Sequence, residues 1–293
     1  ATRDLPDARS PLPRAEPRPP LAARPRRLAV TDIETWRRDP YAIYAKHILR
    51  LRALDPLDAD PDRADLGTAI HKTLADFVHC FPRDLPAHAE ATLLELGGTH
   101  FAALLSRPGA WAFWWPRFER IARWFAAEER ARRGALVDSA SERKGSLVIA
   151  APGGPFTIEA TADRIDRLAT GELVVIDYKT GVVPTKPEIE AAIAVQLPLE
   201  GAIAQAGGFG AAAPVAALEH WRLGGGNPAG VRLAMGGDDP AALIAQVLAE
   251  ITAYVAAFDD PAMPYRPVPF ARWRPRYSDY AQLERLDESE AEP

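Results

Sequence analysis

Residues 173–181 read Leu173-Val174-Val175-Ile176-Asp177-Tyr178-Lys179-Thr180-Gly181. Four apolar residues, three of them β-branched, predict a short buried strand that ends before Gly181. Because side chains alternate between the two faces of a strand, Asp177 and Lys179 should share a face, with Val175 behind them. The sequence therefore predicts a carboxylate and an ammonium group side by side where a strand leaves its sheet.

This pair suits phosphodiester chemistry. A carboxylate can hold a hard cation such as Mg²⁺, and a neighbouring ammonium group can stabilise the charge that builds on a phosphate. Taken alone, an Asp-x-Lys pair is more often an ordinary ion pair at the end of a strand. The surrounding residues must decide between the two interpretations.

The composition is that of an ordinary globular chain. Its 293 residues are 47% hydrophobic and 26% charged, enough for one large domain or two small ones. The net charge of -5 gives no overall signature of nucleic-acid binding, although positive charge can gather on one face. We see no signal peptide and no apolar run of membrane-spanning length, and therefore expect a cytoplasmic protein without a membrane partner.

The single cysteine, Cys80, limits the possible cofactors. One cysteine forms no internal disulfide, no cysteine-rich zinc site and no cysteine-ligated iron–sulfur cluster. We therefore expect no iron–sulfur cluster in this chain.

Composition also divides the chain. Residues 1–27 alternate proline, arginine and alanine without an apolar period, which predicts a disordered linker; a contact with DNA is the less favoured interpretation. We expect the chain to be a fragment of a larger protein. Residues 28–286 should form one domain, followed by an acidic tail at 287–293. Within that domain we expect a mainly helical part at 28–135, a sheet core at 136–260 and a C-terminal clasp at 261–286.

The N-terminal part shows helical periodicity. A capping box at Thr31–Glu34 should begin a first helix, and Asp39-Pro40-Tyr41 a second. Further helices are expected at 66–81, 86–105 and 109–133. The last is rich in aromatic residues, which predict a packed core, with base stacking as the alternative. Its arginines could flank a phosphate backbone or form a solvated face; they are Arg117, Arg120, Arg123, Arg130, Arg132 and Arg133.

The pattern changes to strands near residue 137. Segments 141–150 and 155–168 are joined by Pro152-Gly153-Gly154-Pro155, a hairpin signal, and the strand at Leu173 follows after a short turn. These segments predict an antiparallel meander. A helix after Pro187 with a kink at Pro198, strands at 216–222 and 230–234, and a helix at 239–258 complete the chain. The expected fold class is α/β (α+β-like), with a mixed, partly antiparallel sheet flanked by helices.

Other polar residues should join Asp177. Asp163 lies in the preceding strand, and antiparallel neighbours can bring the two carboxylates to one face, where they repel unless a cation or proton lies between them. Glu142 could add a third acidic group, and Gln196 could point its amide into the same cleft. Glu142 and Asp166 are explained almost as well as surface acids.

Four motifs together carry a resemblance. They are Leu66-Gly67-Thr68-Ala69-Ile70-His71, Thr161-Ala162-Asp163-Arg164-Ile165-Asp166, Val175-Ile176-Asp177-Tyr178-Lys179-Thr180-Gly181 and Gln196-Leu197-Pro198-Leu199-Glu200. In order and spacing they resemble the RecB-type nuclease domain of the PD-(D/E)XK superfamily, over most of residues 30 to 285. The resemblance implies a restriction-endonuclease-like core.

The resemblance also implies roles for single residues. His71, Asp163 and Asp177 would be metal ligands, with the Tyr178 carbonyl as a further one. Lys179 would be the catalytic lysine and Gln196 would lie near the scissile phosphate, while Glu142 matches the acidic residue of the family only loosely. Considered without the resemblance, His71 is more often a surface or otherwise satisfied histidine.

Within the family, the chain is most similar to the C-terminal nuclease domain of AddB-type subunits. This similarity implies Mg²⁺ (or Mn²⁺) as cofactor, and as partners DNA, an AddA-type helicase-nuclease subunit and the rest of a larger AddB chain in double-strand break repair. Ala160 and Glu200 depart from the usual glycine and tyrosine. Four cysteines of many relatives are also missing, and we hypothesise that Asp39 pairs with Arg272, Arg274 or Arg276 in their place.

The expected function is Mg²⁺-dependent hydrolysis of DNA phosphodiesters, in single-stranded DNA. The main alternative is a non-cleaving DNA-binding or architectural module with an inactive nuclease fold, against which the joint presence of Asp163, Asp177 and Lys179 argues. A weaker alternative is a metal-dependent phosphoesterase for small substrates. No Walker A loop is present, so ATP hydrolysis would come from elsewhere.

Overall fold

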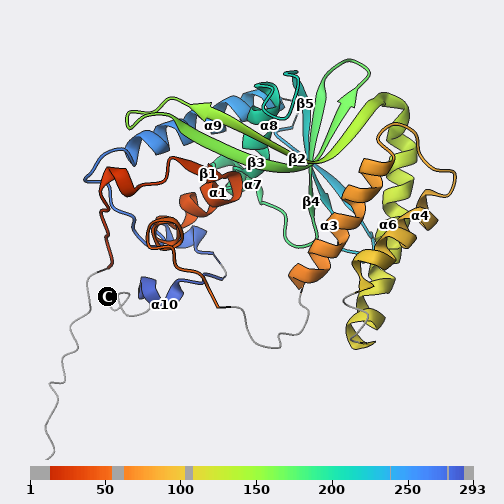
Figure 1. Ribbon diagram of the computed structural model, residues 1–293, viewed down its shortest axis with the longest axis horizontal. Helices are drawn as coiled ribbons and strands as arrows, with labels where there is room; N and C mark the ends of the chain where they lie inside the picture. The colour runs from red at the N-terminus through yellow and green to blue at the C-terminus, as the bar shows by residue number, and fades with distance from the viewer. Residues whose placement is uncertain (1–13, 55–62, 103–107, 238, 276, 287–293) are drawn as a thin grey trace, which may run out of the picture.

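A mixed sheet lies between two helical layers in the computed structural model (Figure 1). The structure describes residues 14–54, 63–102, 108–237, 239–275 and 277–286; the expected linker before residue 14 and the acidic tail lie outside these ranges. The sheet has six strands in the order β1-β3-β4-β5-β6, with β2 paired to β3. The strands are β1 (Arg27–Ala29), β2 (Leu136–Ile149), β3 (Phe156–Leu168), β4 (Leu173–Lys179), β5 (Val215–Arg222) and β6 (Val231–Met235).

The helices form two groups along the chain, one before β2 and one after β4. The first group is η1 (Leu21–Ala23), α1 (Val30–Arg38), α2 (Pro40–Ile43), η2 (Tyr44–Ile48), α3 (Arg63–Cys80), α4 (Ala89–His100), α6 (Pro108–Arg132) and η3 (Arg133–Ala135). The second group is α7 (Lys186–Glu190), α8 (Gln196–Gln205), α9 (Pro240–Ala257), η4 (Ala271–Trp273) and α10 (Ala281–Glu284).

The predicted meander is present. β2 pairs with β3 and β3 with β4, both antiparallel, whereas β4 runs parallel to β5 and β5 antiparallel to β6. The sheet is therefore mixed and partly antiparallel, as the sequence indicated. β4, which carries Asp177 and Lys179, lies inside the sheet between β3 and β5.

The side chains of β4 alternate between two cores. Leu173 and Val175 belong to the core under α1, α8 and α9, whereas Val174, Ile176 and Tyr178 belong to the core under α3, α4 and α6. Figure 1 shows the same two groups of helices on opposite sides of the sheet. Because both faces are covered, the strand is apolar at every position up to Asp177.

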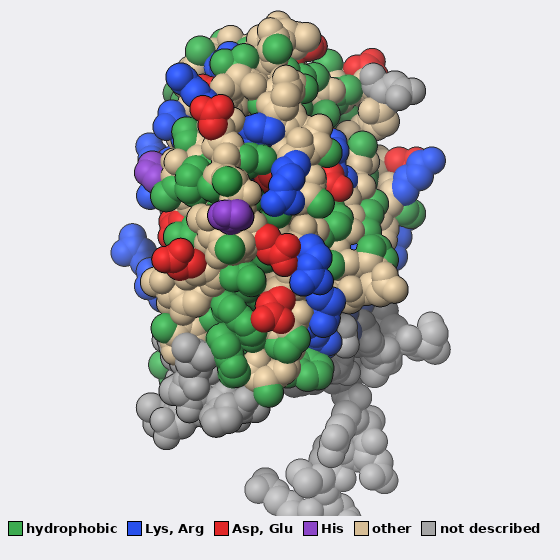
Figure 2. All heavy atoms as spheres, turned by 90° about the vertical axis from the view of Figure 1, so that its right-hand side faces the viewer, with side chains coloured by type: hydrophobic (Ala, Val, Ile, Leu, Met, Phe, Trp, Pro, Cys, Tyr) green, Lys and Arg blue, Asp and Glu red, His purple; other side chains and the backbone are tan. Residues whose placement is uncertain are grey.

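The aromatic residues of α6 mainly fill the second core. Phe118 and Phe125 are fully buried, and Trp124 packs edge-on against Trp221 of β5, with ring centroids 5.5 Å apart. The core interpretation is therefore confirmed for these residues, while Phe113 remains exposed. Over this side of the molecule, basic and acidic side chains are interspersed rather than gathered by sign (Figure 2).

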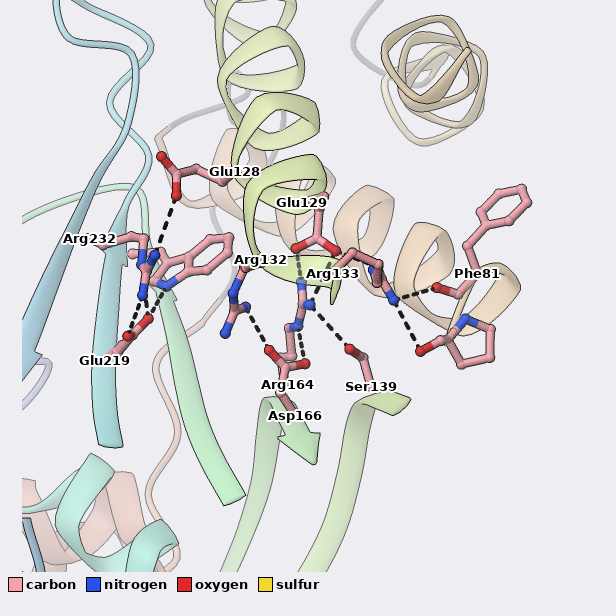
Figure 3. A network of polar contacts seen from close by, with 12 residues as sticks. Phe81, Glu128, Glu129, Arg132, Arg133, Ser139, Arg164, Asp166, Glu219 and Arg232 are labelled. Carbon is pink, nitrogen blue, oxygen red and sulfur yellow. Dashed lines mark hydrogen bonds and ion pairs between the residues drawn. The ribbon is translucent and has the colours of Figure 1, made fainter. Parts of the chain in front are cut away.

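A buried ion network joins α6 to the sheet (Figure 3). Arg164 on β3 is fully buried and donates to both carboxylate oxygens of Glu129, at 2.6 and 3.2 Å, and to Asp166, at 2.6 Å. Arg132 lies 2.6 Å from Asp166, and Arg133 contacts Glu129. Burial alone would raise the pKa of Asp166, but Arg164 and Arg132 hold it below its ordinary value. Asp166 is thus a structural anchor, and the surface interpretation of this residue is wrong.

Some boundaries differ from the predictions. α1 begins at Val30 without a side-chain cap, so the capping box at Thr31–Glu34 is wrong. Pro198 lies in the first turn of α8. Backbone N–H groups in a first turn have no partner within the helix, so a proline there removes no hydrogen bond and causes no kink. β1 was not predicted because three residues show no periodicity; it pairs in parallel with Thr157–Glu159.

Residues just before β1 are also more structured than predicted. Arg24 is buried, and its guanidinium group donates to the backbone carbonyls of Pro19, Phe258, Asp260 and Pro261. An arginine that satisfies its donors on backbone oxygens ties the segment to the end of α9. The disordered linker that the sequence predicted for residues 1–27 therefore does not extend to residue 27.

One helix, α9, is long and apolar enough to cross a membrane by length and composition alone. Its buried residues include Ile244, Val247, Ile251 and Val255, all of which belong to the core under α1 and α8. This one-sided burial is typical of a helix that covers the sheet of a soluble domain.

The contact expected for Asp39 is different in the structure. Its carboxylate accepts hydrogen bonds from the backbone N–H groups of Tyr41 (3.1 Å) and Val268 (3.3 Å). It lies fully buried beside the carboxyl group of Glu284 on α10, while Arg272 lies over the Trp273 ring. Arg276 is outside the described residues. At this contact between the N- and C-terminal parts, the carboxyl group of Asp39 therefore lies beside that of Glu284 and does not form an ion pair with Arg272.

Replacing Arg164 by methionine should destabilise the protein strongly. Arg164→Met leaves Glu129 and Asp166 as buried charges without their main partner, which should lower the free energy of unfolding by about 3–5 kcal/mol in urea denaturation. Arg130→Met, at an exposed position of α6, the helix that carries Glu129, should change the free energy of unfolding by less than about 0.5 kcal/mol. Equal effects of the two substitutions would contradict a structural role for the network.

Asp39→Asn should make the stability less sensitive to pH. Burial and the neighbouring Glu284 raise the pKa of Asp39 to about 7. An acid with a raised folded-state pKa keeps its proton to higher pH in the folded protein than in the unfolded chain. The wild type should therefore lose stability as the pH rises from the ordinary pKa of 3.8 to the folded-state pKa of about 7. Asparagine keeps the acceptor that caps α2 but carries no charge, and should remove much of this loss in urea unfolding at several pH values.

Asp239→Asn is the matched control, because Asp239 caps α9 in the same way at an exposed position. It should leave the wild-type dependence on pH in place. If Asp39→Asn also followed the wild-type curve, the buried carboxyl pair would not be the cause of that dependence.

Candidate active site

Polar residues form a row across four strands of the sheet. The register of β2 on β3 sets Glu142 opposite Asp163, and extending the register of β3 on β4 by one residue sets Asp163 opposite Asp177. β4 on β5 then pairs Asp177 with His220. Since directly opposite residues place their side chains close together, the row brings acidic groups from distant sequence positions to one place.

Asp163 connects β4 to helix α3. Its Oδ2 accepts the backbone N–H of Tyr178 at 2.8 Å, and its Oδ1 lies 3.4 Å from Nδ1 of His71. α3 can come this close because Gly67 has no side chain: a Cβ there would lie 2.9 Å from Oγ1 of Thr180. The glycine four residues before His71 therefore lets the helix carry the imidazole to the end of β4.

Asp177 is buried and held by three side chains. Lys179 Nζ and Gln196 Nε2 donate to Oδ1, at 2.9 and 2.7 Å, and His220 Nδ1 lies 3.0 Å from Oδ2. Gln196 also accepts a hydrogen bond from Lys179 through its Oε1, at 3.0 Å. Lys179, Asp177 and Gln196 thus form a closed triangle of hydrogen bonds, which fixes the position of the ammonium group.

The charges of this triangle stabilise one another. Burial would lower the pKa of Lys179, but the adjacent Asp177 raises it above its ordinary value. Burial would raise the pKa of Asp177, but the hydrogen bond from His220 and the charge of Lys179 hold it low. At neutral pH the lysine is therefore an ammonium ion and the aspartate a carboxylate.

His71 and Glu142 lie on the other side of Asp163. Burial would lower the pKa of His71, but the carboxylate of Asp163 raises it above its ordinary value. Burial and the charge of Asp163 raise the pKa of Glu142, whose backbone has a left-handed φ of 49°. Both residues line a cavity of about 530 Å³, so the exposed Glu142 faces the same space as His71.

Tyr178 contributes through its backbone. Its ring is buried beside Phe125 and Trp221, and its N–H holds Asp163. Its carbonyl as a metal ligand stays a prediction, as do the ligand roles of the other residues.

A second cavity of about 600 Å³ opens beside Lys179 and Gln196. It is also lined by His220 and Glu34, and burial raises the pKa of Glu34. Glu200 lies behind Gln196 and accepts its Nε2–H at 3.1 Å, while burial raises the pKa of Glu200 well above its ordinary value. Glu200, which stands in place of the usual tyrosine, therefore puts a carboxyl group with a raised pKa next to the triangle.

Sequence reasoning missed three of these residues. Glu34 was assigned to a helix cap, Glu200 was noted only as a departure from the family, and His220 was not noted. His220 could have been found from Glu219-His220-Trp221, where polar residues interrupt an apolar strand that runs parallel to β4. A polar residue paired with Asp177 has to lie near it.

The donors in this row suit a hard divalent cation. A set made mainly of carboxylate oxygens, with one imidazole, fits Mg²⁺ or Mn²⁺ better than zinc. Asp163, Asp177 and His71 are the side chains that would hold it, with Glu142 at the rim. Over the described ranges, no three His, Cys, Asp or Glu side chains already converge in metal-binding geometry.

The family comparison agrees with this chemistry. A family model described as the PD-(D/E)XK nuclease superfamily matches residues 27–277. The match contains the row of polar residues and the sheet that carries it.

The chain is similar to part of much longer proteins from Rickettsia. An uncharacterised protein of Rickettsia bellii is 32% identical over 204 residues, covering 70% of this chain and 24% of that protein. One of Rickettsia felis is 31% identical over 186 residues, covering 62% and 22%. The chain thus spans about a quarter of the length of these relatives. The crystal structure of SSO0001 shares 15% identity with a TM-score of 0.28, over 64% of this chain and 74% of that one, too distant to support an argument.

Proposed function

Because the chain belongs to the PD-(D/E)XK nuclease superfamily, we propose that it is a Mg²⁺-dependent deoxyribonuclease that hydrolyses phosphodiester bonds in single-stranded DNA. The observation that carries this proposal is the Lys179 ammonium group 2.9 Å from Asp177, next to Asp163, which the extended register of β3 on β4 sets opposite Asp177. A divalent cation held by the two carboxylates, together with the fixed ammonium group, would complement the negative charge of a phosphate in its transition state.

The residues have separate tasks in this proposal. Asp163 and Asp177 hold the cation, with His71 as a further ligand. When bound, Mg²⁺ supplies Lewis-acid chemistry, which polarises the phosphate and lowers the pKa of the attacking water. Lys179 keeps its proton and stabilises the negative charge on the phosphate oxygens, while Gln196 holds the ammonium group in place through its Oε1.

We further propose that the chain is the nuclease domain of a longer, cytoplasmic AddB-type subunit, acting with an AddA-type helicase subunit in double-strand break repair. Its relatives are about four times as long as the matched region, which supports a role as one domain among several. The motif order around Asp163, Asp177 and Gln196 supports the AddB-type assignment.

Lys179→Ala should slow cleavage of labelled single-stranded DNA in Mg²⁺ by at least about 10²–10³-fold, because it removes a donor that acts on the transition state. Lys144→Ala, at an exposed position of β2, is the control and should cleave like the wild type. Wild-type protein that binds DNA without cleaving it would favour the inactive module instead. Hydrolysis of small nucleotide esters alone would favour the small-substrate phosphoesterase.

Removal of divalent cations should stop the reaction. EDTA is expected to abolish cleavage, and added Mg²⁺ or Mn²⁺ to restore it, because the carboxylates hold the ion that activates the water. The measurement is the rate of oligonucleotide cleavage before and after chelation. Cleavage that persists unchanged in EDTA would contradict the proposed mechanism.

A further inference from the structure

The two oxygens of Asp177 have different surroundings. Oδ1 accepts hydrogen bonds from both Lys179 and Gln196, which uses both of its acceptor positions. Over the described residues, the partner of Oδ2 is Nδ1 of His220, at 3.0 Å. One acceptor position of Oδ2 is therefore left for a further ligand.

The protonation of His220 follows from this contact. His220 Nδ1 lies within hydrogen-bond distance of Oδ2, and because a carboxylate oxygen can only accept, Nδ1 is the donor of this bond. Nε2 of His220 is buried and has no hydrogen-bond partner among the described residues. The polar contact of His220 that the structure shows is therefore the one that its Nδ1 makes with Asp177.

The backbone fixes the imidazole beside the carboxylate. Asp177 and His220 are register partners on two parallel strands, and each of these strands has a neighbour on its other side. His220 is only 4% exposed. A carboxylate held at one oxygen alone can rotate, because the terminal torsion of aspartate has a broad energy minimum. Holding both oxygens defines the plane of the group.

We propose that His220 is a positioning residue, whose Nδ1–H holds Asp177 so that the remaining acceptor position of Oδ2 faces a divalent cation shared with Asp163. This inference rests on the proposed function, because it assumes a metal site between the two carboxylates. Hydrogen bonds to ligating groups are a general feature of metal sites, and their loss typically weakens metal affinity about 10–100-fold.

The test is Mn²⁺ binding, followed as loss of the free-ion signal in electron paramagnetic resonance. His220→Leu keeps much of the bulk but has no donor, and should weaken binding about 10–100-fold. His220→Asn places an amide N–H near the position of Nδ1 and should retain most of the affinity. His220→Gln places its amide near Nε2 instead, and should bind as weakly as the leucine variant.

A matched control is available at the surface. His47 pairs with Asp32 at the same distance, 3.0 Å, away from the row of polar residues. His47→Leu should bind Mn²⁺ like the wild type. Urea unfolding of each variant shows whether it is folded. If His220→Leu fails to fold, the Mn²⁺ affinities of His220→Asn and His220→Gln still test the role of Nδ1.

The outcomes separate this inference from the proposed function. Wild-type protein that takes up no Mn²⁺ would overturn both. Wild-type affinity in His220→Leu, or equal loss in the asparagine and glutamine variants, would overturn the role of His220 and leave the metal site standing. Loss in leucine and glutamine with retention in asparagine is the result expected.

Discussion

The register of two antiparallel strands places Asp163 and Asp177 opposite each other, and the rest of the site is built around these two residues. Neighbouring carboxylates repel each other, so each of them needs its own donors. Asp163 has the Tyr178 N–H and the imidazole of His71, and Asp177 has Lys179, Gln196 and His220. The elements that supply these donors, α3, α8 and β5, pack directly against β4.

The register itself is held from the opposite face of the sheet. Arg164 follows Asp163 in sequence and points the other way, where Glu129 and Asp166 bind its guanidinium group (Figure 3). A slip of one residue would bury the Asp163 carboxylate among apolar side chains and expose Arg164. The buried network therefore helps to fix the strand register that the candidate active site needs, because Arg164 and Asp163 are adjacent residues of β3.

Short-range patterns made much of this predictable. The apolar run before Asp177, the hairpin signal at Pro152–Pro155 and the return to helical periodicity after Pro187 identified the meander and its neighbours. Asp163 and Asp177 could be placed together because a short turn fixes how their strands pair. His220 could not, because β5 comes after a long connection and parallel pairing leaves no local signal. The partner of Asp39 was also misjudged, because a buried carboxyl pair between residues 245 positions apart depends on tertiary packing.

The central claim is that Asp163 and Asp177 share a divalent cation, and anomalous diffraction from crystals soaked in Mn²⁺ tests it most directly. The account predicts an anomalous peak between the two carboxylates, within coordination distance of Oδ2 of Asp177 and with His71 turned toward it. A difference map without a peak there, in crystals that bind Mn²⁺ elsewhere or not at all, would contradict it.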